Sequence, residues 1–156
     1  MRENIGIFRG KRIDTGAWKE GYFLGLQDKI SGTDLFFIVD EMGEYHRVDP
    51  ETVGEYTGLT DSNGTGIFEG DILCSLAAKR KVISVVKIGA FKPDFFYDYA
   101  HEHGYDMSVK VYGLYAYVAS DREDIMFAAD MKLASVIGNI HDNPELLEGE
   151  PNEQNR

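Results

Sequence analysis

The chain has 156 residues, a single cysteine and a formal net charge of −11, from 16 basic and 27 acidic residues. This length suits one domain, and the lone Cys74 excludes an internal disulfide framework. The acidic balance disfavours general nucleic-acid binding, and with neither a signal segment nor an apolar run of about 18 residues, we expect a cytoplasmic protein that does not enter a membrane.

The first third of the sequence alternates apolar and polar residues with a period of two, which predicts strands. Predicted strands cover residues 18–26, 35–39 and 45–48, the second of them buried, with a turn around Gly43. Asp49 followed by Pro50 has the pattern of a helix N-cap with proline at the first helical position. We therefore expect a β-meander, one helical turn at residues 49–51, and an extended segment over residues 53–57.

The run Asp61-Ser62-Asn63-Gly64 predicts a hairpin turn, because an Asn-Gly pair accepts positive φ angles. A calcium loop has a similar opening, but Ile72 stands where that loop needs a bidentate glutamate. Further on, the pair Gly70-Asp71 is expected to bend the chain into a new strand. The residues assigned to structural turns are therefore Asp61, Asn63, Gly64, Gly70 and Asp71.

The segment from residue 67 onward resembles the opening of a small SH3-like barrel. Further strands are expected over residues 82–88, 109–118 and 136–140, with a short helix over 125–131 and a turn through 144–147. The predicted fold is mainly β: one domain over 1–147, with an N-terminal β-meander segment (1–66), an SH3-like barrel portion (67–142) and one or two short helical turns. Residues 148–156 form a polar, acidic tail expected to be disordered.

Three blocks carry a family resemblance: FRGKRIDTGAWKEGY (residues 8–22), RVDPETVGEYTGLTDSNGTGIFEGDIL (47–73) and SVIGNIHDNPELL (135–147). Together and in this order they resemble the YopX family, met mainly in bacteriophages and prophages of Firmicutes. The resemblance implies a shared fold and a mobile-element setting. It carries over no catalytic residue.

The sequence does not assemble a recognisable catalytic or metal centre. Asp98, His101, His103 and Asp106 are ordinary metal-ligand types, but their spacing is not diagnostic and the two histidines diverge on a helix, so we expect them to be solvated. His46 and His141 look isolated, and the apolar neighbours of Cys74 predict a buried, inert thiol. The expectation is a non-enzyme without cofactor or metal.

Aromatic residues are dense after residue 91, and Phe95, Phe96, Tyr97 and Tyr99 are the candidate protein-contact surface. The predicted function is that of a phage or prophage accessory protein, a non-enzymatic module that binds an unknown host or phage protein or associates with itself. One alternative is an acidic DNA mimic that inhibits a host nucleic-acid enzyme. Another is a nucleic-acid-binding barrel that uses Arg9, Lys11, Arg12 and residues 79–81.

Overall fold

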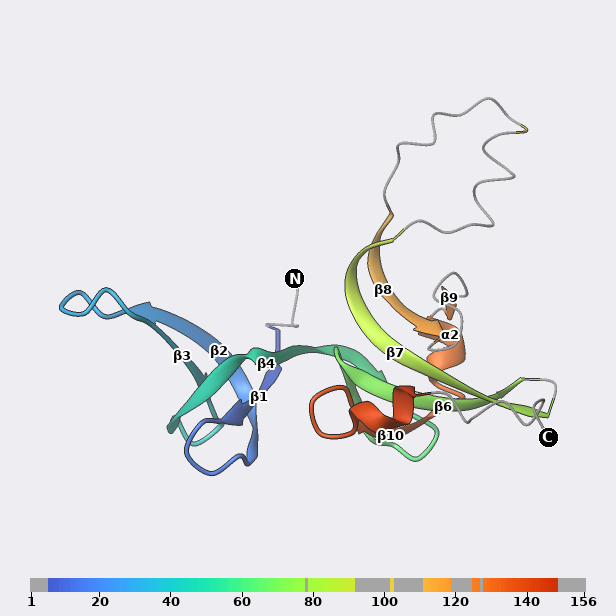
Figure 1. Cartoon of the computed structure of the whole chain (residues 1–156), viewed down its shortest axis with the longest axis horizontal. Coiled ribbons are helices and arrows are strands. Elements are labelled where there is room, and N and C mark those ends of the chain that lie inside the picture. Colours follow the sequence, from blue (N-terminus) through green and yellow to red (C-terminus); the bar gives the residue numbers. More distant parts are fainter. Residues whose placement is uncertain are drawn as a thin grey trace. The chain divides into compact units, whose positions relative to one another are not determined.

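The computed structural model describes residues 6–77, 79–91, 102, 111–118, 125–126 and 128–148. It divides into two units, Met1–Thr57 and Gly58–Arg156, which are described separately below. The described residues lie mostly in antiparallel strands with very little helix (Figure 1). The expectation of a mainly β protein is confirmed.

Unit 1 contains β1 (Phe8–Arg12), β2 (Trp18–Gln27), β3 (Asp34–Val39) and most of β4 (Tyr45–Thr60). Each strand pairs with the next, as in the predicted meander, and β1 also pairs with β4. The fully buried Ile38 and Val48 lie at its centre. Close strand approach needs glycine at Gly10, where an added Cβ would lie 3.1 Å from the side chain of Val48.

The helical turn expected at residues 49–51 is wrong, because β4 runs through this segment as an extended strand. A bulge takes its place, marked by a shift in the β1–β4 register between Arg9 and Lys11. Thr52 Oγ1 accepts a hydrogen bond from the backbone N–H of Lys11 (2.9 Å) and donates to the Asp49 carbonyl (2.7 Å). The Thr52 side chain thus supplies hydrogen bonds where the backbone ladder between the strands is interrupted. A bulge is also one of the few places in a strand that tolerate a proline such as Pro50.

The β2–β3 hairpin extends beyond the strands that flank it. β1 pairs with β2 at residues 18–21 and β4 pairs with β3 at residues 37–39, whereas residues 22–27 of β2 and 34–36 of β3 have only each other as strand partners within the described residues. Figure 1 shows these segments running out to the 28–33 turn as a two-stranded ribbon. We call residues 22–39 the arm.

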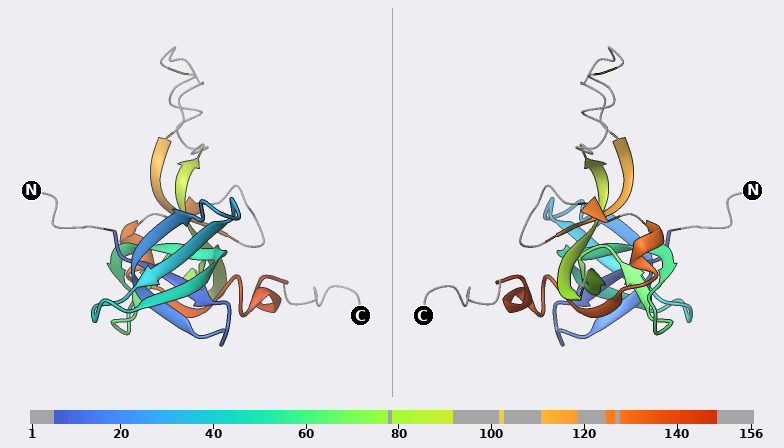
Figure 2. Two further views of the ribbon diagram at one scale, coloured as in Figure 1. Left: turned by 90° about the vertical axis from the view of Figure 1, so that its left-hand side faces the viewer. Right: turned by 90° about the vertical axis from the view of Figure 1, so that its right-hand side faces the viewer.

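Unit 2 is built on an antiparallel sheet with the strand order β10-β6-β7-β8-β9. Its elements are β5 (Gly66–Phe68), β6 (Asp71–Ala77), β7 (Arg80–Phe91), β8 (Val111–Val118), β9 (Ile125–Met126), α2 (Ala128–Met131), β10 (Ser135–Asn139) and the 3-10 turn η1 (Pro144–Leu147). Both views of Figure 2 show β7 and β8 rising together as a long curved hairpin. The core of this unit joins Ile67, Leu73, Val86, Ala116, Met131 and Ala134.

Three sequence predictions concern this unit. The helix expected over 125–131 begins only at Ala128, because Ile125 and Met126 pair with β8 as a short strand; tertiary pairing overrides local helix preference here. Among the described residues the strand order of this sheet does not close on itself, so it does not establish the SH3-like barrel, which stays a prediction. The turn over residues 144–147 is present as η1.

Candidate functional site

One face of the arm and its neighbour β4 is covered with apolar side chains. In the β2–β3 register, Tyr22 lies opposite Val39, Leu24 opposite Phe37, and Leu26 opposite Leu35. Tyr45 of β4 lies opposite Val39, so it joins the same face, and the exposed Arg47, opposite Phe37, adds a charged side chain at its edge. We call this surface the arm face: Tyr22, Leu24, Leu26, Leu35, Phe37, Val39 and Tyr45.

The arm face is open to solvent. Tyr22 is 48% exposed, Leu26 49% and Tyr45 65%, and the other four residues are half-buried. Phe37 and Tyr45 contact each other edge to face, with ring centroids 6.4 Å apart. Soluble proteins seldom leave a contiguous apolar surface uncovered unless it contacts a partner.

The opposite face of the same strands carries the buried residues Ile38 and His46 and the stacked rings of Phe23 and Phe36. The run LFFIV in β3 therefore places apolar side chains on both faces, a pattern typical of strands covered on both sides. Its sequence predicted a buried strand, but only Ile38 is buried. The apolar residues of the arm face were visible in the sequence. The sequence did not show that no other element covers them.

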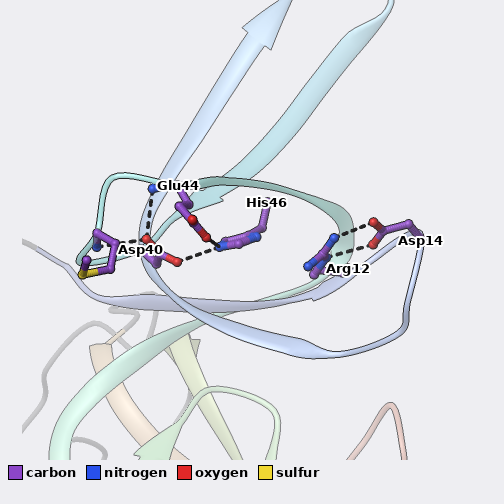
Figure 3. A network of polar contacts seen from close by, with 6 residues as sticks. Arg12, Asp14, Asp40, Glu44 and His46 are labelled. Atoms are coloured by element: carbon purple, nitrogen blue, oxygen red, sulfur yellow. Dashed lines mark hydrogen bonds and ion pairs between the residues drawn. The ribbon is translucent and has the colours of Figure 1, made fainter.

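A polar cluster lies beside the arm, where β3 turns into β4 (Figure 3). His46 Nε2 lies 2.7 Å from Asp40 Oδ2 and 4.0 Å from Glu44 Oε2. The three donor atoms all lie within 4.8 Å of one another. The interpretation of His46 as isolated is wrong, because the turn around Gly43 brings Asp40 across from β3, and Glu44 lies two residues before His46 on the same side of the chain.

Backbone hydrogen bonds fix the orientation of the Asp40 carboxylate. Its Oδ1 accepts the N–H groups of Met42 and Glu44, both at 3.0 Å, so its Oδ2 faces His46. The hydrogen bond from His46 lowers the pKa of the Asp40 carboxyl below its ordinary value, and the hydrogen bond from the Glu44 backbone makes the next largest contribution. The carboxylate is therefore ionised at neutral pH.

The basic residues of the N-terminal cluster are engaged within unit 1. Arg12 donates to both carboxylate oxygens of Asp14, at 2.9 and 2.5 Å, and this pairing lowers the pKa of Asp14 (Figure 3). The Arg9 guanidinium lies over the Trp18 ring, 5.0 Å from its centroid. These contacts leave the cluster a weaker phosphate binder than its sequence indicated.

The Asp61 carboxylate organises the turn between β4 and β5. Its Oδ1 accepts the N–H groups of Asn63 (2.8 Å) and Thr65 (2.9 Å), and its Oδ2 accepts that of Val136 in β10 (2.8 Å). Gly64 has a φ of +83°. Because backbone donors occupy the carboxylate oxygens, the group holds the fold together and is not available as a calcium ligand.

A second aspartate forms the corner between β5 and β6. Asp71 Oδ2 accepts the N–H of Phe68 at 2.8 Å, and Asp71 is 1% exposed. Gly70 adopts a φ of +85° and forms backbone hydrogen bonds with Val86 and Ile140. This is the sharp bend that the Gly-Asp pair predicted.

The predicted contact residues Phe95, Phe96, Tyr97 and Tyr99 lie outside the described residues, as do Asp98, His101, His103 and Asp106. Cys74, expected to be buried, is half-buried. It lies two residues before Leu76, which is largely exposed near the turn of the β6–β7 hairpin.

The structure and comparisons together define the class of the protein. It is an antiparallel, almost entirely β protein with an exposed apolar arm face and a small His-carboxylate cluster, and no helix among its described residues is long and apolar enough to cross a membrane. The family model described as YopX protein matches residues 8–148, so the chain belongs to the YopX family. No curated protein matches the chain.

Proposed function

We propose that this protein is a phage-type accessory protein that acts by binding another protein, and that the arm face is its contact surface. YopX family membership fits a phage-type accessory role. The observation that supports the contact surface is the set of seven aligned apolar residues, of which three are exposed and four half-buried. This surface adds to the Phe95 to Tyr99 segment, which stays a candidate.

The composition of the arm face suits recognition. Aromatic side chains each bury about 150–250 Å² when covered and dominate binding hot spots. Tyr22 and Tyr45 combine an apolar ring with a polar tip, a property favoured at surfaces that are alternately wet and covered. Because β2 and β3 hold these residues in register, little side-chain ordering is needed on binding.

Charge around the arm indicates the chemistry of the partner. Between Trp18 and Arg47 the sequence places six carboxylates against three cations, and the whole chain carries a net charge of −11. A partner with an apolar patch rimmed by lysine or arginine is complementary to this surface. Two copies of the acidic chain repel each other, so we propose a different protein as the occupant.

We further propose a role without catalysis and a location in the cytoplasm. The protein has no catalytic step and works in the cytoplasm of the bacterial host. For residues 67–142 we retain the SH3-like barrel as a proposal, and an experimental structure of the full chain tests it. A closed strand order there would support it, and an open sheet would contradict it.

DNA mimicry is the second candidate, and the net charge of −11 is the observation that favours it. Under this alternative, the captured partner is a nucleic-acid enzyme, and duplex DNA competes with the protein for it. Under the proposed apolar contact, DNA does not compete. Direct nucleic-acid binding receives less support, because Asp14 engages Arg12, and a gel shift at low salt tests it.

Affinity capture with matched variants tests the proposal. The bait is the full chain in host lysate, compared with a Leu26→Ser/Tyr45→Ser variant of the arm face. The control is Leu76→Ser/Leu133→Ser, which replaces two exposed leucines of unit 2. We expect the wild type and the control to retain one specific protein and the arm variant to lose it at least about 10-fold, the equivalent of 1.4 kcal/mol.

Equal capture by all three baits would contradict the arm face as the contact surface. Sedimentation of the purified chain over a range of concentrations distinguishes self-association. A dimer that the arm variant abolishes would replace the heterologous partner by a second copy. A monomer throughout supports the proposal.

A further inference from the structure

We propose that Asp40, Glu44 and His46 form a binding site for a divalent transition-metal ion, with zinc as the best match. The inference is independent of the protein-binding proposal. It rests on the convergence of three ligand atoms from the two sides of the β3–β4 turn. One imidazole nitrogen and two carboxylate oxygens make a ligand set that zinc, cobalt and similar ions accept.

The spacing of the donor atoms is close to what an ion requires. Ligands about 2.1 Å from a tetrahedral ion lie about 3.4 Å from one another. The Nε2 to Oδ2 distance of 2.7 Å and the Nε2 to Oε2 distance of 4.0 Å straddle that value. Each of these two distances needs to change by less than about 1 Å, and the two carboxylate oxygens, which lie within 4.8 Å of each other, need to approach by at most about 1.4 Å.

Two of the three ligands are already held in place. The His46 side chain is 7% exposed and that of Asp40 is 16% exposed. The N–H groups of Met42 and Glu44 fix Asp40 Oδ1, so that Oδ2 is the oxygen presented to the site. Such hydrogen bonds to the far side of a ligand are a usual feature of metal sites, because they orient the donor atom.

The third ligand leaves an entry route. The Glu44 side chain is 71% exposed, so it is free to swing onto an incoming ion from the solvent side. Three protein ligands leave the fourth position of a tetrahedral ion for water or for a donor from a partner. The ion binds His46 Nε2 in place of hydrogen, the neutral imidazole keeps its one proton on Nδ1, and the ion joins both sides of the turn.

The glutamate also gives the sharpest variant for a test, because its exposure makes a folding defect unexpected. Glu44→Gln removes the anionic ligand and keeps the side-chain size. Glu41→Gln is the matched control, because this exposed glutamate lies in the same turn but does not belong to the converging set. Both variants change the net charge of the chain by the same amount.

The experiment uses the full chain without an affinity tag, freed of metal by chelator. Isothermal titration with ZnCl2 and absorption spectra with CoCl2 follow binding. We expect one saturable site in the wild type and in Glu41→Gln, with the visible bands of tetrahedral cobalt. We expect Glu44→Gln to bind at least about 10-fold more weakly and to change the cobalt spectrum.

A His101→Ala/His103→Ala variant separates this site from the other histidine cluster. Retention of one site in that variant supports the proposal. Loss of binding in that variant but not in Glu44→Gln would overturn it. Equal affinities for Glu44→Gln and Glu41→Gln, or no saturable binding at all, would also overturn it.

Discussion

Replacing Asp61 by asparagine tests the role of the buried turn carboxylate. The substitution keeps the shape of the side chain and removes its charge. In the folded protein it places an amide donor where Oδ1 or Oδ2 now accepts backbone N–H groups. A flip of the amide changes which bonds are lost but restores neither the charge nor the missing acceptor.

The expected loss of stability follows from the three bonds. A hydrogen bond to a charged group contributes about 1.5 kcal/mol or more, and the neutral equivalent about half as much. With the carbonyl oxygen in the place of Oδ1, the Asp61→Asn side chain weakens the bonds to Asn63 and Thr65 and loses the one to Val136. The free energy of unfolding is expected to fall by about 3 kcal/mol.

The dependence on pH provides a second readout. Burial raises the pKa of the Asp61 carboxyl, but the three backbone donors together lower it by more, and the net direction is downward. A carboxyl whose pKa is lower in the folded than in the unfolded state stabilises the fold at any pH above its unfolded pKa of about 3.9. This contribution is lost as the pH falls through the folded-state pKa. The difference in the free energy of unfolding between wild type and variant should therefore be largest at neutral pH and shrink below about pH 4.

Urea unfolding followed by circular dichroism, at neutral pH and in steps toward acid, measures both effects. Asp130→Asn is the matched control, because Asp130 is exposed, and it should change the free energy of unfolding by less than about 0.5 kcal/mol. A loss for Asp61→Asn no larger than that of the control would refute the reasoning. A difference that persists unchanged into acid would refute the assigned pKa direction.

Three further substitutions probe the backbone and the core. Gly70→Val should destabilise by about 2 kcal/mol in a thermal melt, because a β-branched residue opposes a φ of +85°; an unchanged melt would contradict the bend. Gly21→Ala should cost more, since its Cβ would overlap the carbonyl group of Val39, and soluble, wild-type-like protein would count against this packing. Ser84→Ala should be neutral or stabilising by up to about 1 kcal/mol, because its buried hydroxyl has no hydrogen-bond partner among the described residues; a clear loss in urea unfolding would indicate one.

Much of the strand architecture is readable from the sequence. Alternation located β2, and a short continuous apolar run located β3, each to within a residue or two. The bend at Gly70-Asp71 followed from glycine's access to positive φ and the short reach of the aspartate side chain. These features depend on neighbours in the chain, which a sequence displays directly.

Features that depend on distant partners were not readable in the same way. Asp49-Pro50 has the local pattern of a helix start, but pairing with β1 keeps the segment extended as a bulge. His46 looked isolated because Asp40, its hydrogen-bonded partner, reaches it from the other side of a turn. The continuous apolar run of β3 also does not tell whether its second apolar face is covered by the same chain or left open.

The pairing of β1 with both β2 and β4 has a consequence for how the chain is made. Lys11 and Thr52, 41 positions apart, are joined by a hydrogen bond. During synthesis β1 leaves the ribosome early, and its second neighbour follows only after the whole β2–β3 hairpin has emerged. Closing so long a loop carries an entropic cost that local hairpins avoid, so β1 is expected to dock on β4 late and to be slow to find its register.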